Sequence, residues 1–136
     1  MDWITDEIAV GNYLEALDIE LLQRDRFASA LSLDGTLYGK DPADCGLRRI
    51  EVVRLEDAPG NDFRLFKLAV DNLVELVRDA PPVLVQCHAG RSRSAVVVAG
   101  YLVTARGIDP EEALRFVAGK REIAVTLGLE QLLDSL

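Results

Sequence analysis

The chain has 136 residues, of which 49% are hydrophobic and 28% charged, so we expect one ordinary core and a single domain over residues 1–136. Its 23 Asp and Glu against 15 Lys and Arg give a net charge of −8, which argues against general nucleic-acid binding. No apolar run approaches the ~18 residues of a membrane span, and the acidic first residues are unlike a signal peptide. We therefore expect a cytoplasmic monomer without stable membrane insertion.

Short apolar or β-branched runs alternate with longer helical patterns, an order typical of α/β domains. The strands are predicted at residues 8–10, 27–33, 50–55 and 83–85. The apolar spacing predicts helices over 13–24 (one bent helix or two short ones), from 63 towards Pro81-Pro82, and over 92–106, 109–119 and 126–136. We expect a three-layer α-β-α fold with a short, mostly parallel central sheet of four or five strands.

The most informative segment is Gln86-Cys87-His88-Ala89-Gly90-Arg91-Ser92-Arg93-Ser94, which follows an apolar strand and opens a helix. Backbone N–H groups of such a turn, together with the helix N-terminus, form a cradle for a phosphate-sized dianion without a metal. Gly90 permits a positive φ, and Arg93 offers a planar fork to two phosphoryl oxygens. The same positive field favours the thiolate of Cys87, so this cysteine is a candidate nucleophile.

Other phosphate cradles and metal sites fit the sequence less well. The Gly-Lys-Ser/Thr of a Walker-type nucleotide loop is missing. Two cysteines, one histidine and no Cys-x-x-Cys pair imply no disulfide framework, no metal site and no cofactor.

The segment from Cys87 to Ser94 matches the Cys-x5-Arg-Ser/Thr signature of the cysteine-based protein tyrosine phosphatases and resembles the small dual-specificity branch. This resemblance implies a phosphomonoester hydrolase that acts on phosphotyrosine, and on phosphoserine or phosphothreonine, through a cysteinyl-phosphate. Cys87 would attack, Arg93 would bind the phosphoryl group and Ser94 would help the thiolate leave. The residues between them would contact the substrate phosphate: His88, Ala89, Gly90, Arg91 and Ser92.

The chain differs from this family at two supporting positions. Gln86 stands where the family usually has His before the cysteine, and Val125-Thr126 stands where it usually has Pro-Asn. Neither difference removes a reacting group.

Cleavage of a phosphate ester needs a proton for the leaving oxygen, and a carboxylic acid on a mobile loop can supply it. We predict Asp57 as this acid because it follows a strand, lies in a loop with Pro59 and Gly60, and precedes the cysteine by 30 residues. Asp62 is the alternative acid, although it also suits a helix N-cap, and Glu56 is interpreted as a solvated neighbour.

Three further interpretations stay open at this stage. His88 and Arg91 are either solvated loop residues or additional cations for a phosphoinositide or other small phosphate. Cys45 is either a spectator or a partner for oxidised Cys87. The chain is also compatible with a phosphate-binding module that has the cradle without turnover, and the complete Cys87, Arg93, Ser94 and Asp57 set favours an enzyme.

Overall fold

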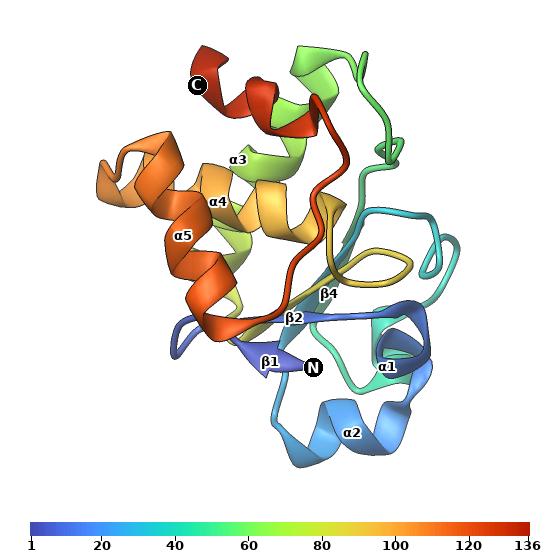
Figure 1. The fold of residues 1–136 in the computed structure, drawn as a ribbon. Coiled ribbons are helices and arrows are strands. Elements are labelled where there is room, and N and C mark those ends of the chain that lie inside the picture. The colour runs from blue at the N-terminus through green and yellow to red at the C-terminus, as the bar shows by residue number, and fades with distance from the viewer.

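A five-stranded sheet runs through the centre of the computed structural model, which describes residues 1–136 (Figure 1). The strand order is β1-β2-β5-β3-β4, and only the edge pair β1–β2 is antiparallel. The strands are β1 (Asp2–Trp3), β2 (Ile8–Gly11), β3 (Ser29–Ser32), β4 (Arg49–Val52) and β5 (Val83–Gln86). The helices are α1 (Tyr13–Leu17), α2 (Ile19–Arg24), α3 (Phe63–Asp79), α4 (Arg93–Arg106) and α5 (Pro110–Lys120). Two 3-10 segments cover Pro42–Cys45 and Leu129–Ser135.

The sheet separates two hydrophobic cores because successive side chains of a strand point to opposite faces. Val83 and Val85 of β5 pack into the larger core with α3, α4 and α5, whereas Leu84 packs into the smaller core with α1 and α2. Helices accordingly cover both faces of the sheet (Figure 1). The predicted three-layer α/β architecture is confirmed.

Helix α4 is buried along most of its length because it lies between α3 and α5, against the larger core. Its sequence is apolar on nearly all sides, as a fully surrounded helix requires. Gly100 allows the close approach of α3, since a Cβ there would lie 2.7 Å from Val70 Cγ2. This buried helix fixes the loop that precedes it.

Most predicted elements are present, with two differences. The 13–24 segment has the second of its two predicted forms, two short helices, and Asp18 caps the second of them through its side chain. The helix predicted over 126–136 is wrong: Gly128 has φ 91°, and only a 3-10 segment follows it. Strand β1 was not predicted, because its two residues carry no periodic pattern and form a strand only by pairing with β2. No helix combines the length and the apolar character needed to span a bilayer.

Candidate active site

The loop between β5 and α4, residues 87–92, leaves the sheet at the carboxyl end of its central strand. β5 lies between β2 and β3, which run parallel to it, and ligands of open α/β sheets bind at such strand ends. The backbone fixes both sides of the loop's start: Leu33 N donates to Gln86 O at 2.7 Å and Tyr13 N donates to His88 O at 3.1 Å. We call residues 87–92 the phosphate loop.

A pocket of about 320 Å³ opens over the phosphate loop. Cys87 lies at this pocket and is 2% exposed. Arg93 donates from Nη1 to Leu55 O at 3.0 Å, while its buried Nε has no partner in the protein. A buried N–H without an acceptor is costly, and a phosphoryl oxygen would satisfy it. The residues around the pocket are Asp57, Cys87, His88, Ala89, Arg91, Ser92, Arg93 and Ala124.

Gly90 gives the phosphate loop its tight shape. Its φ is 70°, in the left-handed region that favours glycine. A Cβ at this position would lie 2.7 Å from Gly11 O and 2.8 Å from Arg121 Nη2. The positive φ expected at Gly90 is confirmed, and the close backbone of Gly11 leaves no space for a side chain there.

The start of the phosphate loop is held by the side chain of Gln86. Ser32 Oγ donates to Gln86 Oε1 at 2.7 Å, and Gln86 Nε2 donates to Asp34 Oδ1 at 2.8 Å and to Thr36 Oγ1 at 3.2 Å. Burial alone would raise the pKa of Asp34. Hydrogen bonds from Thr36 and Gln86, and the positive charge of Arg93, outweigh burial and hold that pKa below its ordinary value. An amide thus orders this position where the family usually has His.

The other end of the loop is joined to Asp57 by two hydroxyl groups. Ser92 Oγ donates to Asp57 Oδ1 at 2.5 Å, and Thr126 Oγ1 donates to the same oxygen at 2.7 Å. Thr126 N also donates to Ser92 Oγ at 3.0 Å. The structure therefore places the predicted acid at the phosphate loop.

The two competing acids lie elsewhere. Asp62 caps α3 by accepting from Arg64 N at 2.9 Å, and this hydrogen bond lowers its pKa. The backbone N–H of Glu56 donates to Asn61 Oδ1, and its side chain is not part of the pocket wall. Among these three carboxylates only Asp57 faces the pocket.

The remaining predicted site residues occupy distinct places. The ring of His88 stacks on Tyr13, with centroids 4.5 Å apart and planes 5° apart, and Arg91 is exposed at the pocket. Ser94 is buried, and its Oγ has no partner within the protein. Cys45 is buried in the smaller core and Cys87 belongs to the larger one, so the sheet lies between these two free cysteines.

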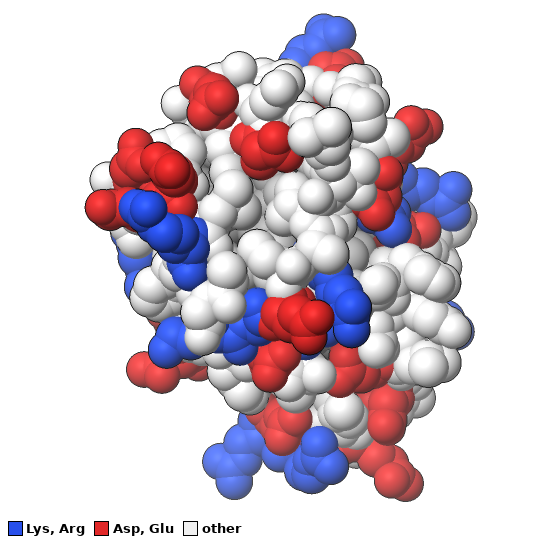
Figure 2. Space-filling model, in the orientation of Figure 1, with Lys and Arg blue, Asp and Glu red and all other residues white.

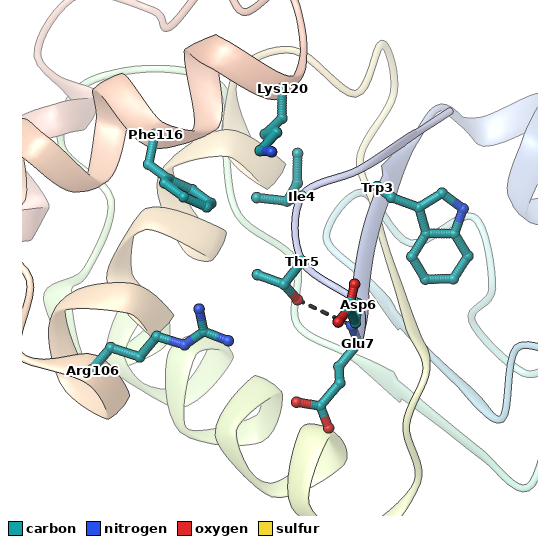
Figure 3. Close-up of a pocket in the computed structure, with 8 residues that line it drawn as sticks. All are labelled: Trp3, Ile4, Thr5, Asp6, Glu7, Arg106, Phe116 and Lys120. Atoms are coloured by element: carbon teal, nitrogen blue, oxygen red, sulfur yellow. Dashed lines mark hydrogen bonds between the residues drawn. The ribbon is translucent and has the colours of Figure 1, made fainter.

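A larger cavity, about 460 Å³, lies away from the phosphate loop (Figure 3). The strand β1 and the turn after it form one wall, and Arg106, Phe116 and Lys120 form the other. None of the reacting groups predicted from the sequence contributes to it. On the face drawn in Figure 2, acidic and basic side chains are mixed, with no extended basic area. No group of three or more His, Cys, Asp or Glu side chains is arranged to hold a metal ion.

Known proteins resemble this chain in both sequence and fold. A family model described as the dual specificity phosphatase catalytic domain matches residues 39–134. Dual specificity protein phosphatase 1 of Arabidopsis thaliana is 30% identical over 121 residues, which is 89% of this chain and 60% of that protein. Dual specificity protein phosphatase 22 of Mus musculus is 29% identical over 124 residues, which is 91% of this chain and 66% of that protein.

Two solved structures extend the likeness to the fold. A mouse putative dual specificity phosphatase complexed with zinc tungstate has a TM-score of 0.84 at 27% identity, over 98% of this chain and 84% of the other. Human DUSP28 has a TM-score of 0.85 at 23% identity, over 99% of this chain and 94% of the other. The chain belongs to the dual specificity phosphatase catalytic-domain family, and it spans 60% and 66% of the length of the two curated relatives above.

Sequence reasoning missed several supporting residues. Asp34 and Thr36 look like ordinary loop residues in the sequence, and Arg121, which donates from Nε to Gly90 O at 2.6 Å, has no motif around it. Thr126 stands out only as a departure from Pro-Asn. That departure is the one sequence signal that points to the connection with Asp57.

Proposed function

We propose that this chain is a metal-independent phosphatase that hydrolyses phosphotyrosine, and phosphoserine or phosphothreonine, in protein substrates. One observation carries the proposal: Cys87, Arg93 and Asp57 surround one pocket at the N-terminus of α4. A buried cysteine at this position, beside an arginine and a helix N-terminus, has the surroundings that activate a thiol as a nucleophile.

In the first step, the Cys87 thiolate forms a bond to phosphorus while the bond to the leaving oxygen breaks. Asp57 gives its proton to that oxygen, and the substrate leaves as an alcohol or phenol. The backbone N–H groups of the phosphate loop and the guanidinium of Arg93 hold the phosphoryl oxygens, where negative charge is greatest.

In the second step, water attacks the cysteinyl-phosphate. The Asp57 carboxylate takes a proton from this water, the S–P bond breaks, and inorganic phosphate and the Cys87 thiolate are formed. The unpartnered hydroxyl of Ser94 is assigned to stabilise the departing sulfur, as the family resemblance implies.

The test is replacement of the nucleophile. Cys87→Ser should reduce turnover of p-nitrophenyl phosphate to below about a hundredth of the wild-type rate, because an alcohol is a far weaker nucleophile than a thiolate. Binding of tungstate, a tetrahedral oxyanion, should persist because backbone amides and Arg93 hold the anion. Wild-type turnover should be unaffected by EDTA. A Ser variant that keeps more than that rate would exclude a nucleophilic cysteine, and no wild-type turnover at all would favour a phosphate-binding module.

A phosphate monoester on a lipid is the second candidate substrate. A 36-residue stretch is 56% identical to human phosphatidylglycerophosphatase and protein-tyrosine phosphatase 1, whose name covers both substrate classes. Arg91 is an exposed cation at the pocket, whereas the His88 ring is packed on Tyr13. A panel of phosphotyrosine peptide, phosphothreonine peptide and a phosphoinositide should rank the peptides first. Preference for the lipid would reverse this order of candidates.

A further inference from the structure

The segment that follows α5, residues 121–128, runs along the phosphate loop and is called the connector here. Arg121 Nε donates to Gly90 O at 2.6 Å, Ala124 N donates to Arg91 O at 3.0 Å, and Thr126 N donates to Ser92 Oγ at 3.0 Å. These three bonds follow the phosphate loop residue by residue. The connector is therefore fixed to the loop along most of its length.

The connector also touches the loop that carries Asp57. Thr126 Oγ1 donates to Asp57 Oδ1, and a Cβ added at Gly128 would lie 3.0 Å from Pro59 Cβ. Thr126 is the one connector residue with hydrogen bonds to both loops. Its backbone contacts the phosphate loop and its side chain contacts the acid, so it sets the position of one relative to the other.

The hydrogen bonds distinguish the two oxygens of the acid. Each hydroxyl has one proton, and Oδ1 of Asp57 lies 2.5 Å from Ser92 Oγ and 2.7 Å from Thr126 Oγ1, whereas the two hydroxyl oxygens are 3.4 Å apart, so both protons are assigned to Oδ1. The other oxygen, Oδ2, takes part in no hydrogen bond within the protein. In the protonated acid the transferable proton is therefore on Oδ2.

We propose that Thr126 is a positioning residue of the general acid, which holds Asp57 Oδ1 so that Oδ2 delivers the proton to the leaving group. This inference rests on the proposed role of Asp57. Thr126 does not contact the reacting phosphorus centre in this assignment, and acts only through the carboxyl group. Ser92 holds the same oxygen, but it is part of the phosphate loop, so Thr126 is the separable member of the pair.

The test compares Thr126→Val with the wild type on aryl phosphates of different leaving groups. Valine keeps the volume and the backbone N–H that donates to Ser92, and replaces the hydroxyl with a methyl group. Because the carboxylate that forms as the proton leaves Asp57 loses one of its two hydrogen bonds, kcat/KM for phenyl phosphate should fall about 10-fold. For p-nitrophenyl phosphate, whose leaving group needs little protonation, it should fall less than about 2-fold. Thr126→Ser should restore both values.

A double-variant cycle separates the acid from the phosphate loop. In an Asp57→Asn background there is no proton to deliver, so Thr126→Val should change the rates by less than about 2-fold. A matched control is Leu127→Ala, since Leu127 is the adjacent connector residue and is 86% exposed. It should leave the leaving-group dependence unchanged, and urea unfolding of each variant checks that it is folded.

The outcomes identify which proposal fails. Thr126→Val could lower kcat/KM equally for phenyl and p-nitrophenyl phosphate, or lower it as much in the Asp57→Asn background as in the wild type. Either result would mean that Thr126 acts through the phosphate loop, and would overturn the positioning role alone. If Asp57→Asn does not slow phenyl phosphate more than p-nitrophenyl phosphate, Asp57 is not the acid, and the proposed role of Thr126 is wrong as well.

Discussion

The phosphate loop is held at its two ends by different chemistry. At its start, the buried Gln86 amide is fixed by Ser32, Asp34 and Thr36, groups that follow or end the neighbouring strand β3. At its far end, Ser92 is part of a partly exposed cluster with Asp57 and Thr126. None of the residues that hold Gln86 is a candidate reacting group, although Cys87 follows Gln86 in the chain. The cluster at the far end, by contrast, includes the candidate acid Asp57. We therefore expect damage at the start to affect loop order and stability, and damage at the far end to affect proton transfer.

The largest expected effect belongs to Asp57 at the far end. Asp57→Asn should lower kcat/KM for phenyl phosphate by ~10²–10⁴-fold and should hardly affect p-nitrophenyl phosphate, because only a basic leaving group needs the proton. Steady-state kinetics on the two esters measure both effects.

Asp62→Asn is the matched control for this variant, because Asp62 is a carboxylate near the same loop that caps α3 instead. It should cost ~1 kcal/mol or less of stability and leave the leaving-group dependence unchanged. If Asp62→Asn gave the steep dependence and Asp57→Asn did not, the acid would be Asp62.

A smaller effect, of another kind, is expected from Gln86 at the start of the loop. Gln86→Leu removes the hydrogen bonds that the Gln86 amide makes with the buried Ser32 hydroxyl and the half-buried Asp34 carboxylate, and should lower the free energy of unfolding by ~1–3 kcal/mol. Turnover should fall by a similar factor for phenyl and p-nitrophenyl phosphate, since proton transfer is untouched. Urea unfolding and kinetics on both esters measure this contrast.

The control is Gln131→Leu, at an exposed glutamine of the C-terminal 3-10 segment, which should change stability by less than ~0.5 kcal/mol. A Gln86→Leu variant that selectively slowed phenyl phosphate would show that the two ends of the loop are not separable.

The smallest expected effect is the pH dependence contributed by Asp34. Its pKa is depressed in the fold, so its ionisation stabilises the protein above the ordinary Asp value and that stability is lost as the pH falls through the lower folded value. The stability difference between the wild type and Asp34→Asn should be constant near neutral pH and should shrink below about pH 4. Urea unfolding between about pH 7 and pH 3 measures it.

Asp6→Asn offers a control, because Asp6 is exposed and its carboxylate has no ion pair and accepts no hydrogen bond within the protein. Its stability difference from the wild type should not follow the pattern of Asp34. A difference for Asp34→Asn that grew on acidification would contradict a depressed pKa in the folded protein.

Local sequence patterns were sufficient wherever one segment determines its own structure. The apolar run before Cys87 predicted a strand, the apolar spacing after it predicted a helix, and Asp62 suited an N-cap; the structure has all three. The spacing from Cys87 to Arg93 was enough to predict the cradle, because both residues lie on one strand–turn–helix unit. The structure places Asp57 at the pocket and Asp62 at the N-cap of α3, and local sequence can suggest this difference because a cap and a free loop carboxylate have different neighbours in the chain.

Tertiary structure alone decided the contacts that hold this site together. Gln86 and Asp34 are 52 residues apart, and Thr126 and Asp57 are 69 residues apart, so no local pattern records either pair. The end of the chain shows the same limit: an amphipathic pattern predicted a helix over 126–136, but the left-handed backbone at Gly128 and packing on the core allow only a 3-10 segment. Sequence by itself was enough to identify the candidate reacting groups and the elements that carry them. Their supports were decided by the packing of segments distant in the chain, because hydrogen bonds between such segments form only once the sheet has brought them together.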